Sequence, residues 1–473
     1  MMKGKYSALI RDIFIFTIST FIPKAISFFL VPLYTNCLTT AEYGLASLLS
    51  TTVSLMIPFL TLGINDSVLR FTIENKEDSR PFQIAFSFAL KSIAIVSVLV
   101  IINCFAQIIK VDNQIAVVFL LNYVSVSVYG ICIAYLRAVE QTILLSVVSI
   151  LITLVVVISN VVLLLGVKAG LMGYMVSEIL GYTVADMVIL IKIKGIKLLQ
   201  GKGTPNPELK KKMIAYSVPL IAASVSWWIN SSSDKYFVTA MSGVGANGVY
   251  SVAYKIPTIL QMLQSVFSQA WLLSIYREYK KESGPKFVSN VYEIYYVAMS
   301  LSCAVIIVLD IPLAKFLYAK EFFAAWEYVP FLLISVVFIA NAGFFESMLT
   351  LFKKTKLIAA TTALGAVINI FLNFILIQYI GLLGAAIATM CGYLFMWLIR
   401  IRPAIKRYPF KISWIKCASL HVLLLIESLV MIFLQNYAIC CLIIFIMCLI
   451  NVRTIQQIMI QFRNLFMAKK GDY

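Results

Sequence analysis

Long apolar runs separated by short polar breaks cover almost the whole chain. A helix that crosses a bilayer needs about 20 consecutive, mostly apolar residues. The pattern therefore predicts an all-α polytopic membrane protein with about fourteen transmembrane helices. We place these spans at 10–33, 44–64, 82–109, 115–136, 143–166, 169–191, 213–240, 248–275, 287–309, 328–352, 357–380, 382–400, 417–435 and 437–452. Tight hairpins are expected at 166–169, 380–382 and 435–437.

Two stretches 211 residues apart share the pattern G-L-x-G-x7-G-Y. They are GLMGYMVSEILGY, beginning at Gly170, and GLLGAAIATMCGY, beginning at Gly381. A looser echo pairs AEYGLAS with ANGVYS, 204 to 205 residues further on. An offset that contains six spans preserves orientation in the membrane, as in parallel repeats. We expect six-helix lobes at 1–191 and 213–400, a cytoplasmic linker at 192–212, and a basic linker, helix pair and tail at 401–473.

Lysine and arginine gather in alternate loops. With the N-terminus in the cytoplasm, the inner segments hold 31 of the 39 basic residues and the outer loops hold four. Short loops rich in these residues stay on the cytoplasmic side. We therefore expect both termini in the cytoplasm. The net charge of +18 reflects topology, and we expect no nucleic-acid partner.

Composition argues against catalysis. The chain is 61% hydrophobic and 13% charged, and no loop is long enough for a catalytic domain outside the membrane. The nine cysteines include no CxxC pair, and His421 is the single histidine. We find no phosphate-binding loop and no hydrolase or metalloprotease motif. The sequence thus predicts no enzyme, no catalytic residue, no metal site and no cofactor.

Charged residues inside the predicted spans are the candidates for function. Each costs about 2.5 kcal/mol or more at the bilayer centre, so such residues face a wet cavity or one another. Lys235 and Lys255 flank a glycine-rich turn predicted at 242–248, and we expect Asp234 to pair with the nearer of these two lysines. The residues expected to line a substrate cavity are Lys24, Lys91, Asp234, Lys235 and Lys255. Such a lysine-bearing cavity favours an anionic substrate.

Acidic residues in the spans suggest a coupling group. Glu178, near the middle of the sixth span, is the best candidate for a protonatable coupling residue, although a structural pair between Lys24 and Glu178 is an alternative. For Glu293, Glu346 and Asp186, close to the inner ends of their spans, we expect interfacial solvation or a local ion pair. Glu427 lies outside the repeats.

The chain resembles the bacterial O-antigen and capsular polysaccharide repeat-unit flippases of the multidrug/oligosaccharidyl-lipid/polysaccharide exporter superfamily. The resemblance rests on IRDIFIFTISTFIPKAISFFLVPLYTNCLTTAEYGLASL near the start, LGINDSVLRF at 62–71, SSSDKYFVTAMSGVGANGVYSVAYKI at 231–256 and the twin GLxG hairpins. One departure is the pair Asp234-Lys235, where the family usually has Asp-Arg. Lysine cannot form the bidentate phosphate contact of arginine, which argues against a pyrophosphate clamp here.

The resemblance implies a V-shaped pair of lobes that works by alternating access, with the first, second, seventh and eighth spans lining the cavity. The implied activity is to flip an oligosaccharide on undecaprenyl pyrophosphate from the cytoplasmic to the periplasmic leaflet of the bacterial inner membrane. Coupling to a proton or sodium gradient is implied by analogy. Expected partners are this lipid-linked oligosaccharide, membrane lipids, a polysaccharide polymerase and a chain-length regulator.

Three other functions stay open. A drug or cation antiporter of the same superfamily typically has twelve spans and an acid in its first helix, where this chain has Lys24. A membrane O-antigen polymerase or ligase is expected to carry a large periplasmic loop with arginines, which this sequence lacks. A non-transporting scaffold of the glycan assembly machinery is the third.

Overall fold

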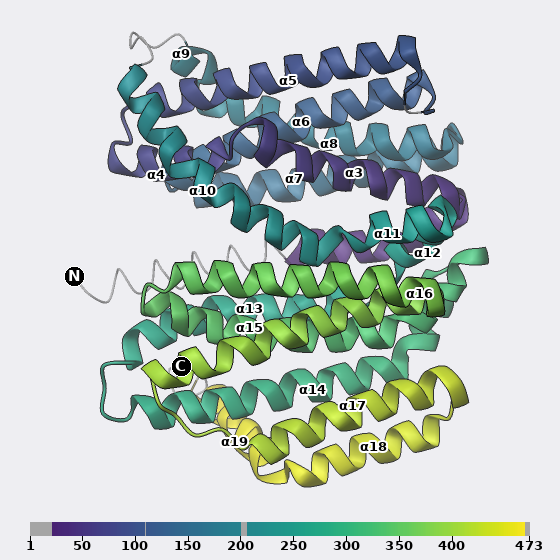
Figure 1. The fold of residues 1–473 in the computed structure, drawn as a ribbon, viewed down its shortest axis with the longest axis vertical. Coiled ribbons are helices and arrows are strands. Elements are labelled where there is room, and N and C mark those ends of the chain that lie inside the picture. The colour runs from purple at the N-terminus through teal and green to yellow at the C-terminus, as the bar shows by residue number, and fades with distance from the viewer. Residues whose placement is uncertain (1–20, 109, 200–205, 469–473) are drawn as a thin grey trace. The chain divides into compact units, whose positions relative to one another are not determined.

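The computed structural model describes residues 21–108, 110–199 and 206–468. Every regular element in this part of the chain is a helix (Figure 1). Helices satisfy their own backbone hydrogen bonds, which the apolar layer of a membrane requires. The predicted all-α membrane architecture is confirmed.

Unit one, the first of two compact units, comprises the described residues up to Trp228 together with Val244–Gly248. Its central helix contacts five others, because small buried residues such as Ser127, Ala134 and Ala138 let neighbouring helices approach. That helix is α6 (Asn113–Ala138), and the five are α3 (Thr40–Leu60), α4 (Ile64–Glu74), α5 (Arg80–Ala106), α7 (Thr142–Asn160) and α8 (Gly170–Lys192). The unit also holds α2 (Val31–Cys37), the π-helical turn η1 (Val161–Gly166), α9 (Gly195–Leu199) and most of α10 (Pro207–Ser232).

Unit two comprises Ile229–Gly243 and the described residues from Val249 onward. Its central helix is α15 (Val329–Leu351), which is apolar over most of its surface and is therefore mostly buried. Around it lie α13 (Pro257–Glu278), α14 (Gly284–Leu317), α16 (Thr355–Arg407) and α17 (Trp414–Leu434). The remaining elements are α11 (Asp234–Ser242), the second half of α12 (Val244–Ala253), the 3-10 helix η2 (Lys320–Tyr328), α18 (Tyr437–Ile450) and α19 (Val452–Ala468).

Ten helices of the described residues are long and apolar enough to cross a membrane, or eleven if α18 and the start of α19 form one bent span. This is fewer than the predicted fourteen for identifiable reasons. The first predicted span lies partly outside the described residues. The span expected at 248–275 is divided into α12 and α13 by a break before Pro257. The spans predicted at 357–380 and 382–400 both lie in α16, which is counted as one helix. Its 53 residues would extend about 80 Å, far beyond an apolar layer of about 30 Å, so it is long enough for two spans.

The two GLxG motifs have the same local structure. Gly170 and Gly381 both adopt left-handed backbone angles, with φ of 53° and 58°. The next glycine of each motif faces the preceding residues: a Cβ on Gly384 would overlap the backbone of Leu376, and one on Gly173 would lie in tight contact with Leu163. Glycine is favoured at the first position by its backbone angle and at Gly384 by this close approach. The hairpins predicted at 166–169 and 380–382 are confirmed, and Ile380 and Gly381 divide α16.

The predicted seven-residue turn at 242–248 was wrong. Only Gly243 leaves the helical conformation, with φ of 92°, and α12 begins at the next residue. The remaining glycines serve a helix crossing instead. Gly44 of α3 lies directly against the backbone of Val244 and Gly248, and the Asn247 side-chain amide donates a hydrogen bond to the Gly44 carbonyl at 2.8 Å. Residues without a Cβ allow two helices to approach this closely.

The boundary between the compact units falls inside α10, after Trp228. The earlier part of α10 packs on unit one, where its Met213 carbonyl accepts a hydrogen bond from Ser67 at 2.6 Å. The Trp228 indole donates to the Thr51 carbonyl at 3.1 Å. The division into lobes at 1–191 and 213–400, with a linker at 192–212, was inferred from the sequence repeat and stays a prediction.

The chain continues as a helix after the last predicted span. α19 is bent by 75° from α18 and is held against α14 by Thr454, whose hydroxyl donates to the Glu293 carboxylate at 2.9 Å. Lys416 forms an ion pair with the same carboxylate at 3.1 Å. The local ion pair expected for Glu293 is therefore confirmed.

Candidate functional site

A buried polar site of unit two surrounds Asp234, the first residue of α11. Its side chain is 1% exposed. One carboxylate oxygen accepts hydrogen bonds from the hydroxyls of Tyr250 at 2.8 Å, Tyr254, and Thr389 at 3.4 Å. The other oxygen accepts the backbone N–H of Lys235 at 3.0 Å. These donors replace part of the water that a buried carboxylate loses.

A second layer of amides supports this site. The Thr389 hydroxyl accepts from the Asn369 side chain at 3.4 Å. The Asn369 side-chain oxygen accepts from Ser233 at 3.3 Å and from Asn373 at 3.0 Å. The site therefore concentrates carboxylate, hydroxyl and amide oxygens, which are the ligand atoms that hard cations prefer. Within the described residues, no three His, Cys, Asp or Glu side chains are grouped so as to bind a metal ion.

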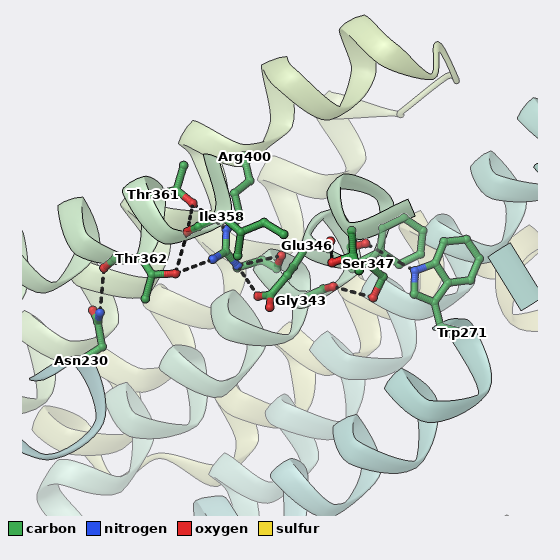
Figure 2. Close-up of polar contacts among 12 residues, drawn as sticks. Asn230, Trp271, Gly343, Glu346, Ser347, Ile358, Thr361, Thr362 and Arg400 are labelled. Carbon is green, nitrogen blue, oxygen red and sulfur yellow. Dashed lines mark hydrogen bonds and ion pairs between the residues drawn. The ribbon is translucent and has the colours of Figure 1, made fainter. Parts of the chain in front are cut away.

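Polar contacts continue from the end of α10 towards α15 (Figure 2). The Asn230 amide donates to the Thr362 carbonyl at 2.9 Å, and the Thr362 hydroxyl accepts from the Arg400 guanidinium at 2.8 Å. Arg400 is 1% exposed and forms an ion pair with Glu346 at 2.8 Å. The ion pair expected for Glu346 is confirmed, and its partner Arg400 joins α15 to both halves of α16.

Glu178 lies at a polar site in unit one. Its carboxylate accepts hydrogen bonds from Ser50 of α3 at 3.3 Å and from the Tyr174 hydroxyl at 3.2 Å. The Tyr174 ring meets the Tyr34 ring edge-on at 4.9 Å, and the Tyr34 hydroxyl accepts from the buried Asn160 amide at 3.2 Å. The site thus combines a half-buried carboxylate with hydroxyl groups and aromatic faces.

The two polar sites share a position in the repeated motif. Glu178 is eight residues after Gly170, and Thr389 is eight residues after Gly381. The two residues therefore occupy equivalent positions, one in α8 and the other in the second half of α16, and each places a polar group in its site. The motif positions Glu178 itself in unit one and a hydroxyl partner of Asp234 in unit two.

The candidate lysines occupy several environments. Lys24 is half-buried on the helical residues 21–29. Lys91 is exposed on α5, with its ammonium 5.7 Å from the centre of the Phe88 ring. Lys235 and Lys255 are half-buried and lie close enough for their charges to repel. That these residues and Asp234 line a substrate cavity stays a prediction.

The neutral partners of Asp234 were missed because sequence reasoning followed charge. Tyr250 and Tyr254 are four residues apart at the end of α12, as are Asn369 and Asn373 within α16. Polar residues with i, i+4 spacing share a helix face. This spacing in an apolar run is the signal that was available.

Comparison with known proteins agrees with this architecture. A family profile described as polysaccharide biosynthesis protein matches residues 9–272. Among curated proteins, none matches the sequence.

Solved transporter structures share the fold. The lipid II flippase MurJ in an inward closed conformation superposes with a TM-score of 0.69 at 15% identity, covering 95% of this chain and 99% of that one. An inward-facing multidrug resistance MATE transporter of the MOP superfamily gives 0.64 at 13% identity, covering 83% and 94%. The Vibrio cholerae MATE transporter VcmN gives 0.59 at 12% identity, covering 85% and 98%. No catalytic family is among these matches.

Proposed function

Because the chain belongs to the polysaccharide biosynthesis protein family, we propose that it flips lipid-linked oligosaccharide units across the bacterial inner membrane by alternating access. The substrate is an oligosaccharide repeat unit on undecaprenyl pyrophosphate, which moves from the cytoplasmic to the periplasmic leaflet. The observation that carries this proposal is the family match combined with the fold of the lipid II flippase over 95% of the chain.

The charged residues supply the proposed substrate contacts. Lys24, Lys91, Lys235 and Lys255 attract the pyrophosphate and any acidic sugar as point charges, without the bidentate geometry of arginine. Their occurrence within predicted spans supports the proposal, since intramembrane charges usually mark a transport pathway. We include fourteen spans and cytoplasmic termini in the proposal, with a polysaccharide polymerase and a chain-length regulator as downstream partners.

The buried carboxylates supply the proposed ion coupling. Asp234 is surrounded by hydroxyl and amide groups, so it can hold either a proton or a small cation such as sodium. Glu178, with its hydroxyl partners in unit one, is the second candidate. Movement of the coupling ion between bulk water and such a site would bias one conformation over the other, because the ion binds the two conformations unequally.

The first experiment is deletion of the gene in its host. Completed lipid-linked units are expected to accumulate in the cytoplasmic leaflet, where periplasmically added glycan-modifying enzymes cannot reach them. Units that reach the periplasm normally but stay unpolymerised would contradict a flippase and favour a polymerase or ligase. Unchanged glycan with increased sensitivity to cationic drugs would favour the antiporter.

The second experiment tests the proposed residues in proteoliposomes loaded with the lipid-linked unit. Asp234→Asn is expected to abolish the dependence of flipping on a proton or sodium gradient. Glu427→Gln is the matched control, because Glu427 is equally buried but lies on α17, outside the Asp234 site. Similarly, Lys255→Ala is expected to reduce flipping, while Lys356→Ala, at an exposed position, leaves it unchanged. Wild-type rates in both test variants would remove these residues from the pathway.

A further inference from the structure

A cavity in unit one has no part in the proposed transport pathway. It has a volume of about 710 Å³ and lies where the end of α6 and the last turn of α8 meet the first two turns of α7. Its size is within the range of about 300–1,000 Å³ that is usual for ligand pockets. Tyr135 and Leu144 line the cavity, with Gln141 and Lys192 as its most polar lining residues.

One wall of the cavity is apolar and open. Ile143 and Val147 line it and remain 60% and 51% exposed. They are four residues apart and therefore lie one above the other on the same face of α7. Because α7 begins a strongly apolar candidate span, such an exposed apolar face is suited to contact with lipid chains. An extended hydrocarbon chain can lie along the two side chains.

The cavity also carries a positive charge, for which the described residues supply no ion-pair partner. Lys192 ends α8 with its side chain exposed, and within the described residues no carboxylate forms an ion pair with it. Glu140, the acid adjacent in sequence to the lining residue Gln141, is engaged with Lys76 at 3.0 Å. The ammonium of Lys192 is therefore available to an anion at the edge of the apolar layer, where membrane phosphates lie.

We propose that this cavity binds an anionic phospholipid of the leaflet that faces the basic loops. The lipid phosphate contacts Lys192, and one acyl chain lies along Ile143 and Val147. The combination of a single cation with an adjoining apolar wall matches a molecule that carries both groups. A soluble anion would leave the apolar wall uncovered, and an uncharged lipid would leave the ammonium unpaired.

The test is native mass spectrometry of the full-length protein, purified in detergent and mixed with equal amounts of phosphatidylglycerol and phosphatidylcholine of identical acyl chains. The wild type is expected to retain phosphatidylglycerol preferentially. Lys192→Ala should lower phosphatidylglycerol occupancy about fivefold, the usual contribution of one lysine at an anionic membrane surface. Ile143→Ser combined with Val147→Ser should lower the occupancy of both lipids, and both positions are exposed enough to tolerate the change.

Lys211→Glu is the matched control, because Lys211 is exposed in the same unit but does not line the cavity. It should retain the wild-type lipid preference. Equal loss of preference in Lys211→Glu and Lys192→Ala would overturn the proposal in favour of a diffuse basic surface. Equal retention of the two lipids by the wild type would also overturn it. Displacement of phosphatidylglycerol by undecaprenyl phosphate in wild type but not in Lys192→Ala would assign the cavity to the substrate carrier instead.

Discussion

The ion pair between Arg400 and Glu346 allows a prediction in which the two partners behave differently (Figure 2). Arg400 is 1% exposed, whereas the Glu346 side chain is 41% exposed. Besides Glu346, the guanidinium donates to Thr361 at 3.0 Å and to Thr362 at 2.8 Å. We compare Glu346→Ala, which leaves a buried cation without its carboxylate, with Arg400→Met, which removes the buried cation itself.

The magnitudes follow from what each substitution leaves behind. Removing one member of a buried ion pair costs about 3–5 kcal/mol. Glu346→Ala should fall near the lower end, because solvent already screens the partly exposed carboxylate. Arg400→Met should cost about 1 kcal/mol or less, since the hydroxyls of Thr361 and Thr362 each keep a hydrogen bond to the Ile358 carbonyl at 2.9 Å. The methionine side chain fills most of the vacated space.

The assay is equilibrium unfolding of the full-length protein in mixed micelles of increasing denaturing detergent, followed by tryptophan fluorescence. Both single variants and the double variant are compared in a double-mutant cycle. The double variant should recover most of the stability lost in Glu346→Ala, because it no longer contains an unpaired buried charge. A loss in Arg400→Met equal to or greater than that in Glu346→Ala would refute the reasoning. So would a double variant as unstable as Glu346→Ala.

Three further predictions concern other parts of the fold, all measured as unfolding midpoints. Gly248→Ala should cost about 1–3 kcal/mol, because its Cβ would overlap the backbone of α3. The control Gly166→Ala, which has open space around it, should change stability by less than about 0.5 kcal/mol. Equal effects of the two substitutions would contradict the close packing at Gly248. Glu427→Met should increase stability by about 1 kcal/mol or more, since both buried carboxylate oxygens lack a hydrogen-bond partner within the described residues; a loss would show that an unseen partner holds the carboxylate. Arg80 hydrogen-bonds to Asp78 and holds its pKa below the usual 3.8, so the stabilisation is present at pH 5 to 8 and is lost as the pH falls through that lowered pKa. Asp78→Asn should therefore lower the midpoint at pH 7, and this effect should fade as the pH falls through that lowered pKa; an effect that grew on acidification would contradict this sign.

The sequence alone determined the helical membrane architecture, because an apolar run of about 20 residues has no other way to satisfy its backbone in a bilayer. It also located the hairpins at Gly170 and Gly381, since left-handed backbone angles there require glycine. Asp234 and Glu178 were identifiable for a similar reason. A charge within an apolar run is costly and therefore has a specific purpose.

Only the tertiary structure decided which groups surround those charges. Asp234 is held by Tyr250, Tyr254 and Thr389, the last of which is 155 residues away. The glycines expected to form a long turn instead support a close helix crossing at Gly44. The apolar layer dictates that a buried charge must find polar partners, but many side chains can supply a hydroxyl or an amide. Which ones do so depends on how the helices pack against one another. A local pattern such as the i, i+4 spacing of Tyr250 and Tyr254 marks a polar helix face, but it does not say which charge that face meets.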